Sequence, residues 1–239
     1  MTPERKRKLQ AVLSRRQADL GIITDSVMKL RNMAAILRSC DAVGVAELDC
    51  CIDPQTFRHY RGTSGTASKW VDIRFRESLE VAIRARQAEG RQVIATALTH
   101  RSVDYRAIDY TRATSIVMGT ELHGMDARGI ELCDACVTIP MLGMVESLNV
   151  SVACAVILFE AQRQRQNAGM YAQRSLSNGH YRRLFFKWAY PKLAAWCDAR
   201  NLEYPELDDD GELRAGSAPV VQRDKKMPDD SFETSGKDH

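Results

Sequence analysis

The sequence predicts an α/β fold in which helices flank a mostly parallel β-sheet. Short runs of consecutive apolar residues, such as "QVIATAL" (92–98) and "TSIVMG" (114–119), have the pattern of strands that are buried on both faces. Between these runs lie segments whose apolar residues recur every three or four positions, which is typical of helices. Strands that alternate with helices in this way favour a parallel sheet.

The first part of the chain begins with a basic helix. Residues 3–18 have a narrow apolar face surrounded by arginine and lysine, which indicates a helix. The segment "LGIITDSV" (20–27) is expected to be a strand, and "NMAAILRSCDAVG" (32–44) a helix. Asn32 is the predicted start of that helix and Gly44 its end, because these residue types favour such positions.

The middle of the chain repeats this alternation of strand and helix. Further strands are expected at residues 45–52, 70–75, 92–98, 114–119 and 135–141. Further helices are expected at residues 77–90, 127–134 and 147–166. A polar loop (58–68), rich in Arg, Gly, Ser and Thr, separates the first two of these strands.

The C-terminal part of the chain has a different character. Residues 180–201 are aromatic and basic, and Pro191 interrupts their helical spacing. From Glu206 on, Asp, Gly, Ser, Pro and Lys dominate, so disorder is expected there. The expected organisation is a basic N-terminal helix (1–18), a central domain (19–168), a C-terminal helical extension (169–205) and an acidic tail (206–239).

The composition suits a globular protein with one core. Of 239 residues, 44% are hydrophobic and 27% are charged, which is ordinary for such a chain. No uncharged apolar run reaches the length of a membrane span, and the charged N-terminus lacks the apolar region of a secretory signal. A cytoplasmic location is therefore expected, with the seven cysteines as reduced thiols.

Two cysteines, Cys133 and Cys136, form a lone CxxC pair. A structural zinc site needs four ligands, and neither a second pair nor a suitably spaced pair of histidines accompanies this one. The pair is therefore interpreted as core thiols, and no metal is expected.

The net charge of +3 hides an asymmetry along the chain. The first 205 residues contain 29 basic and 21 acidic side chains, whereas the remainder contains five basic and ten acidic ones. A body charge of +8 is consistent with a polyanionic partner.

Three segments carry polar residues in a distinctive order: "NMAAILRSCDAVG", "IVMGTELHGM" and "VTIPMLGMVESLNVSVACAV". Taken singly, each has a structural explanation. Asn32 could be a helix cap, and Arg38 a solvated helix residue. The second segment, which has Gly119 and Glu121 in a GxExxG pattern, could be a tight turn, since its spacing differs from the GxGxxG of dinucleotide-binding folds.

Together, the three segments resemble the motifs of the SPOUT methyltransferases, in particular the TrmH-type tRNA (guanosine(18)-2'-O)-methyltransferases. The phrase "SLNVSVA" after "IPM", with "NxxAIxR" upstream, carries this resemblance, which extends over residues 1–212. It implies a deep trefoil knot in the C-terminal part of the α/β domain, flanked by helical extensions. It also implies that S-adenosylmethionine is bound in the knot.

The resemblance also implies which residues hold the cofactor. Backbone groups around Ile139, Met141 and Leu148 would hold its adenine and methionine parts, and Thr96 and Gly119 would complete the pocket from neighbouring strand ends. This position agrees with the rule that ligands lie outside the carboxyl ends of parallel strands. The small side chains of "GMVESLNVSVACA" suit both the crossing of the chain and the close approach of the cofactor.

The implied reaction is transfer of the sulfonium methyl group to a ribose 2'-hydroxyl. In this family the arginine corresponding to Arg38 is held to be essential and has been proposed as the base. A guanidinium has a pKa above about 12 and offers only hydrogen-bond donors. Either Arg38 is deprotonated in a special site, or it clamps a phosphate and aligns the ribose. Because arginine binds phosphate well in a bidentate manner, the clamp is favoured.

The other motif residues would act around this arginine. Asn32 and Ser39 would position the nucleotide, and Glu121 could form a hydrogen bond nearby. Ser147 and Asn149 would have a polar role beside the reaction centre. For Ser147, capping of the long helix remains an alternative.

A structured RNA is held mainly through its phosphates by lysine and arginine. The candidates are Arg5, Lys6, Arg7, Lys8, Arg15, Arg16, Arg58, Arg61, Arg163 and Arg165, of which about half are expected to matter. The aromatic residues Phe185, Phe186, Trp188 and Tyr190 are expected to pack in the core and not to stack on bases. The resemblance further implies a homodimer with active sites at the subunit interface.

The expected function is thus 2'-O-methylation of the D-loop guanosine of tRNA. A ribosomal RNA 2'-O-methyltransferase is the alternative within the same class, although those relatives usually carry a separate N-terminal RNA-binding domain. A non-catalytic RNA-binding protein with the same fold is the alternative from another class. A nicotinamide-dependent enzyme is excluded, because the glycine fingerprint and the acidic ribose contact are missing.

Overall fold

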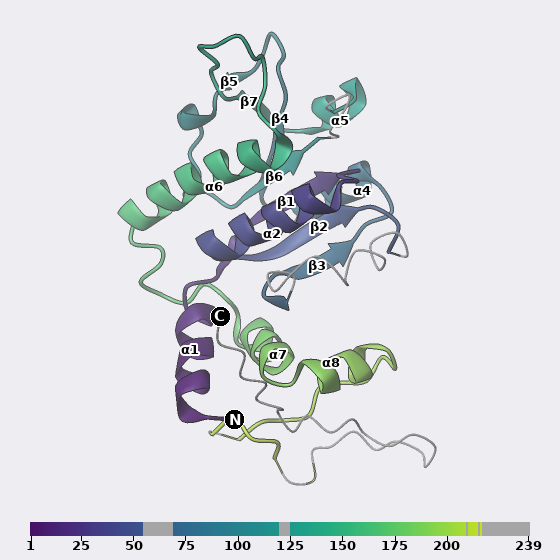
Figure 1. Cartoon of the computed structure of the whole chain (residues 1–239), viewed down its shortest axis with the longest axis vertical. Coiled ribbons are helices and arrows are strands. Elements are labelled where there is room, and N and C mark those ends of the chain that lie inside the picture. Colours follow the sequence, from purple (N-terminus) through teal and green to yellow (C-terminus); the bar gives the residue numbers. More distant parts are fainter. Residues whose placement is uncertain (55–68, 120–124, 209, 215, 217–239) are drawn as a thin grey trace. The chain divides into compact units, whose positions relative to one another are not determined.

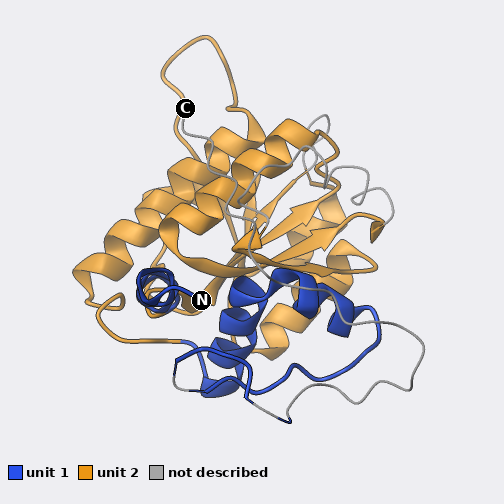
Figure 2. Cartoon of the chain, turned by 60° about the horizontal axis from the view of Figure 1, so that its bottom comes forward, with its two compact units in different colours: residues 1–13, 176–239 blue, residues 14–175 orange. Residues whose placement is uncertain are grey.

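The computed structural model describes residues 1–54, 69–119, 125–208, 210–214 and 216. The predicted loop 58–68 falls outside these described residues. The chain divides into two compact units, residues 14–175 and residues 1–13 together with 176–239 (Figure 2).

The larger unit is built on one parallel sheet. Among the described residues it has seven strands in the order β3-β2-β1-β6-β4-β7-β5, and every neighbouring pair is parallel. The strands are β1 (Gln17–Asp25), β2 (Val45–Cys51), β3 (Asp72–Phe75), β4 (Gln92–Thr96), β5 (Val103–Asp104), β6 (Thr114–Met118) and β7 (Ala135–Thr138). The predicted α/β class with a parallel sheet is confirmed.

Helices cover both faces of this sheet (Figure 1). They are α2 (Leu30–Val43), α4 (Leu79–Ala88), α5 (Ala127–Leu132) and α6 (Val150–Asn167). Helices α2 and α6 pack against each other and against the face that contains Ile22, whereas α4 and α5 pack against the face that contains Ile23. Successive strand side chains point to opposite faces, so the continuous apolar run of β1 fills both halves of the core.

Helix α2 begins earlier than predicted. Its N-cap residue is Lys29, which makes no side-chain capping hydrogen bond, and Asn32 is buried within the first turn. The prediction that Asn32 starts the helix is therefore wrong. The predicted end is confirmed, since Gly44 caps the helix with φ +83°, a left-handed conformation that glycine adopts without strain.

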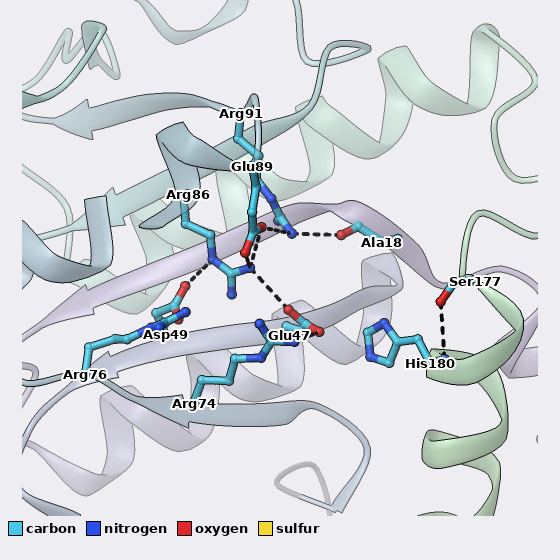
Figure 3. Close-up of polar contacts among 10 residues, drawn as sticks. All are labelled: Ala18, Glu47, Asp49, Arg74, Arg76, Arg86, Glu89, Arg91, Ser177 and His180. Carbon is cyan, nitrogen blue, oxygen red and sulfur yellow. Dashed lines mark hydrogen bonds and ion pairs between the residues drawn. The ribbon is translucent and has the colours of Figure 1, made fainter. Parts of the chain in front are cut away.

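A network of buried ion pairs joins α4 to the sheet (Figure 3). Asp49 on β2 pairs with Arg76 and Arg86, and Glu47 on the same strand pairs with Arg74 and Arg86. Buried carboxylates are tolerated only when they are both paired and hydrogen-bonded, and both conditions are met here. The network links α4 to β2 and, through the arginines at the end of β3, to that edge strand.

A second buried arginine, Arg165, anchors the C-terminal end of α6. Its Nε donates to the Tyr110 carbonyl (2.8 Å), and its Nη2 donates to the Arg112 carbonyl (3.0 Å). Its Nη1 donates to Gln17 Oε1 (3.1 Å) and Asp19 Oδ1 (2.6 Å). One side chain thus joins α6 to the start of β1 and to the segment that precedes β6.

The smaller unit is helical. Its helices are α1 (Pro3–Leu13), α7 (Asn178–Ala189) and α8 (Pro191–Asp198). Helix α1 is shorter than the predicted 3–18, and α8 begins at Pro191, which confirms the predicted interruption. The side chains of Phe185, Phe186, Trp188 and Tyr190 are buried, which confirms that they pack in the core.

The first residues after Glu206 are ordered. Leu207 and Leu213 form an isolated antiparallel bridge, and Tyr190 Oη donates to the Gly211 carbonyl (2.9 Å). Backbone and side-chain hydrogen bonds thus hold a turn at the start of the segment for which disorder is expected. Residues 217–239 lie outside the described part. None of the described helices has the length and apolar character needed to cross a membrane.

Replacing Arg165 by alanine is expected to lower the free energy of unfolding by about 3 kcal/mol, because the change leaves buried acceptors without their partner. Arg163, two residues away, pairs with Glu160 at the exposed surface, so Arg163→Ala should leave the stability nearly unchanged. Chemical denaturation of both variants measures the difference. Equal losses in the two variants would contradict the role given to Arg165.

Candidate active site

A cleft of about 510 Å³ opens at the carboxyl ends of β4, β6 and β7. Its walls come from the start of α2, the three strand ends, the connection from β7 to α6, and the first turns of α6. The position follows from the fold, since carboxyl ends of parallel strands meet at one edge and ligands bind beyond that edge.

The cleft brings together most of the residues that the sequence singled out. All five predicted cofactor contacts line it: Thr96, Gly119, Ile139, Met141 and Leu148. Three of the predicted catalytic residues, Asn32, Ser147 and Asn149, line it as well. Glu121 lies outside the described residues.

Asn149 connects two of the motifs. It is the N-cap of α6, and its Oδ1 accepts hydrogen bonds from the Ser151 backbone amide (2.9 Å) and hydroxyl (2.7 Å). Its Nδ2 donates to Asn32 Oδ1 (3.2 Å) on α2. The side-chain cap considered for Ser147 is therefore provided by Asn149, and Ser147 remains exposed at the mouth of the cleft.

Arg38 and Ser39 do not line the cleft. Both lie on α2, about two turns beyond Asn32. The Arg38 side chain is exposed, whereas the Ser39 hydroxyl donates to the Ala35 carbonyl within the helix (3.0 Å). In this single chain neither residue is directed at the site where the cofactor motifs meet.

Several residues of the cleft were not found from the sequence. Lys29 stands at its mouth, and the apolar side chains of Met118, Met125 and Ile130 line it. Met118 immediately precedes Gly119, so considering the last residue of each predicted strand as well as the residue after it could have identified Met118. Lys29 and Ile130 lie outside the three motif segments, and Met125 ends the second of them without having been singled out.

The predicted RNA contacts fall into distinct groups. Arg7, Lys8, Arg15 and Arg163 are exposed, whereas Arg5 and Lys6 are partly buried. Arg58 and Arg61 lie outside the described residues. Arg16 and Arg165 have no exposed surface and bond to acidic and backbone groups, so neither is available to RNA, which corrects the prediction for these two.

Cys133 follows α5, a helix that contributes Ile130 to the cleft. Burial raises the pKa of Cys133 to about 12, and the Cys133 thiol donates to the Gly129 carbonyl (3.3 Å). Since the thiolate is the reactive form, such a group is a poor nucleophile or metal ligand near neutral pH. Within the described ranges, no group of three or more His, Cys, Asp or Glu side chains could hold a metal ion.

The cleft fits S-adenosylmethionine. Its volume lies within the range of small-molecule pockets, about 300–1,000 Å³. Apolar side chains such as Leu98, Met141 and Ile157 would pack against an adenosyl group, while backbone polar groups of the β7–α6 connection would bind its polar atoms. Apolar walls with a few convergent polar groups are what such a ligand needs.

The fold and this cleft define an α/β enzyme that binds a small molecule at its strand ends. The chain belongs to the SpoU rRNA Methylase family, whose model matches residues 19–159. The model described as SpoU, rRNA methylase, C-terminal, matches residues 163–216. S-adenosylmethionine is the methyl donor of this family.

Named relatives agree with this membership. The chain is 41% identical over 217 residues to the tRNA (guanosine(18)-2'-O)-methyltransferase of Escherichia coli strain K12, covering 90% of this chain and 95% of the relative. It is similar to the crystal structure of the A. aeolicus TrmH/SpoU tRNA modifying enzyme, with TM-score 0.69, 38% identity, and coverage of 79% and 96%. It is also similar to an AdoMet-bound rRNA methyltransferase from Sinorhizobium meliloti, with TM-score 0.54, 31% identity, and coverage of 64% and 59%.

Two substitutions of Asn149 should separate its two contacts. Serine caps a helix as well as asparagine does, so Asn149→Ser should preserve the melting temperature but lose the hydrogen bond to Asn32. We expect binding of S-adenosylmethionine, measured by calorimetry, to weaken by about fivefold in this variant. Asn149→Ala should additionally lose about 1 kcal/mol of stability. Unchanged cofactor affinity in Asn149→Ser would limit Asn149 to capping.

Proposed function

We propose that this protein transfers a methyl group from S-adenosylmethionine to the ribose 2'-hydroxyl of guanosine 18 in the D-loop of tRNA. The observation that carries the proposal is the cleft itself, which gathers eight of the eleven catalytic and cofactor-binding residues expected from the resemblance. The E. coli relative named for this reaction matches nearly the whole chain, and this supports tRNA as the substrate. The reaction would take place in the cytoplasm, where tRNA is processed.

The bound cofactor would supply an already activated methyl group on a sulfonium centre. The task of this chain is then to orient the two reactants and to exclude water from between them. Asn149 and Asn32 form a rigid polar pair at the mouth of the cleft, where a ribose must approach. The exposed Glu146 and Ser147 extend this polar rim.

Arg38 would bind the phosphate next to the target ribose. Its side chain is exposed and does not line the cleft of its own chain, so it can reach a phosphate of a bound RNA. A guanidinium offers only donors, which supports the same assignment. Exposed Arg7, Lys8, Arg15 and Arg163 would hold more distant phosphates.

The protein would act as a homodimer through α6. Val152 and Phe159 lie seven residues apart on one side of this helix and are 48% and 49% exposed. Leu142 and Met144, in the connection just before α6, are fully exposed. A second copy that covers this apolar surface would bring its own Arg38 towards the cleft. The connection before α6 would also form the trefoil knot of the family fold.

The reaction is tested by methyl transfer from labelled cofactor to two tRNA transcripts, one with an unmodified guanosine 18 and one with that ribose already 2'-O-methylated. We expect label only in the first. Ribosomal RNA forms a third arm, because the family is named for that substrate. Label in ribosomal RNA alone would replace the tRNA assignment, and RNA binding without label in any arm would indicate a binding protein.

Mixing two inactive variants tests the shared active site. One variant carries Arg38→Ala, and the other carries Asn32→Ala with Asn149→Ala. If Arg38 serves the cleft of the partner, half of the randomly mixed dimers have one intact site, and about a quarter of wild-type activity returns. If Arg38 serves its own cleft, mixing restores no activity. Light scattering of each variant provides the control that dimers form.

A further inference from the structure

The end of β1 lies where the connections of the sheet change direction. From β1 the chain continues to β2 through α2, and from β6 it continues in the opposite direction to β7 through α5. Helices α2 and α5 cover opposite faces of the sheet. In open α/β sheets a crevice forms between two neighbouring strands whose connections diverge in this way, and ligands bind there. In this sheet the crevice lies between the ends of β1 and β6.

Asp25, the last residue of β1, stands at this crevice. Thr24 is paired with Met118 on β6, so Asp25 adjoins Gly119 at a strand spacing of about 4.8 Å. Met118 and Gly119 both line the cofactor cleft, although Asp25 itself does not. A nucleotide in the crevice would therefore lie directly beside the cofactor.

The Asp25 carboxylate has few polar contacts within the described ranges. Among the described residues it forms no ion pair, and its hydrogen-bond donor there is the Ser26 hydroxyl (3.2 Å). Burial raises the pKa of Asp25, and the negative charge of Asp126 raises it further. Within the described part of the chain, this half-buried carboxylate thus has no cationic partner for its charged form, an arrangement that costs stability.

Ser26 has an unusual backbone. With φ +51°, it is one of two non-glycine residues in the described ranges that adopt a positive φ, and the other, Asn201, belongs to the smaller unit. Such strained conformations persist where function requires a particular orientation of a group. Here the strain places a hydroxyl next to a carboxylate at the crevice. The pair presents one acceptor and one rotatable donor side by side.

We propose that Asp25 and Ser26 recognise the target guanine by its Watson–Crick edge. Asp25 accepts the N1–H of the base, and the Ser26 hydroxyl turns from Asp25 to donate to O6. Adenine presents the opposite pattern at these two positions, an acceptor at N1 and a donor at the exocyclic amine. It would leave the carboxylate facing a lone pair, and sites built on such hydrogen bonds reject the mismatched analogue strongly. The assignment rests on the proposed function.

The test compares tRNA transcripts with guanosine or adenosine at position 18. We expect wild-type protein to methylate the guanosine transcript and strongly disfavour the adenosine one. Asp25→Asn should lower kcat/KM for guanosine at least tenfold. The new amide offers a donor as well as an acceptor, so the preference for guanosine over adenosine should also fall at least tenfold. Ser26→Ala should reduce the preference in the same direction.

Asp126→Asn is the matched control. Asp126 caps α5 by accepting from the Gly129 amide, and asparagine caps equally well. This variant removes a nearby negative charge without touching the crevice, so the base preference should remain that of the wild type. A reduced preference in Asp126→Asn equal to that in Asp25→Asn would reveal a general electrostatic effect and overturn the assignment.

The melting temperature provides an independent readout. Because the pKa of Asp25 is raised, the folded state disfavours its charged form at neutral pH, and Asp25→Asn should melt at the wild-type temperature or above it. A lower melting temperature with unchanged base preference would make Asp25 a structural residue and overturn its role in recognition. A wild-type protein inactive on both transcripts would instead overturn the proposed function, so the two failures are distinguishable.

Discussion

The site depends on how α6 is held at its two ends. At the C-terminal end, the fully buried Arg165 joins the helix to β1 and to the segment before β6. At the N-terminal end, Asn149 caps the helix and donates to Asn32 on α2. Between these ends the helices pack closely through small side chains, and contact with Cys154 raises the pKa of Cys40 well above its usual value. The first turns of α6 are thereby fixed at the carboxyl edge of the sheet, where the cleft opens.

The alternation of strands and helices could be predicted because it depends on local patterns. Continuous apolar runs identified six of the seven described strands, and Gly44 and Pro191 marked two real boundaries. The strand β5 has only two residues, too few to show a recognisable pattern of apolar and polar side chains, so the sequence did not predict it. Asn32 misled the prediction of the start of α2 because its amide pairs with a residue 117 positions away, and no local pattern contains that contact.

The cleft could be predicted only as far as the motifs extend. Its cofactor-facing residues were found because the resemblance names them, whereas Lys29, Met125 and Ile130 become neighbours only through the topology of the sheet. The basic residues were the least predictable. The sequence alone does not distinguish a surface arginine from a buried one. Arg16 and Arg165 are buried because they bind acidic side chains and carbonyls that lie far away in the sequence. Charge in a sequence therefore indicates a class of partner but not the residues that contact it.

The positions of the motif residues give a physical reason why such a site would need two chains. Seven of them meet in one cleft, but Arg38 is exposed on α2, beyond the turn that carries Asn32. Helix α2 packs against α6, and the side chain of Arg38 on it does not line that cleft. The exposed apolar residues of α6 and of the preceding connection lie where a second copy could approach. In the proposed dimer, cofactor binding and phosphate binding would belong to different chains, and the target nucleotide would have to satisfy both at once.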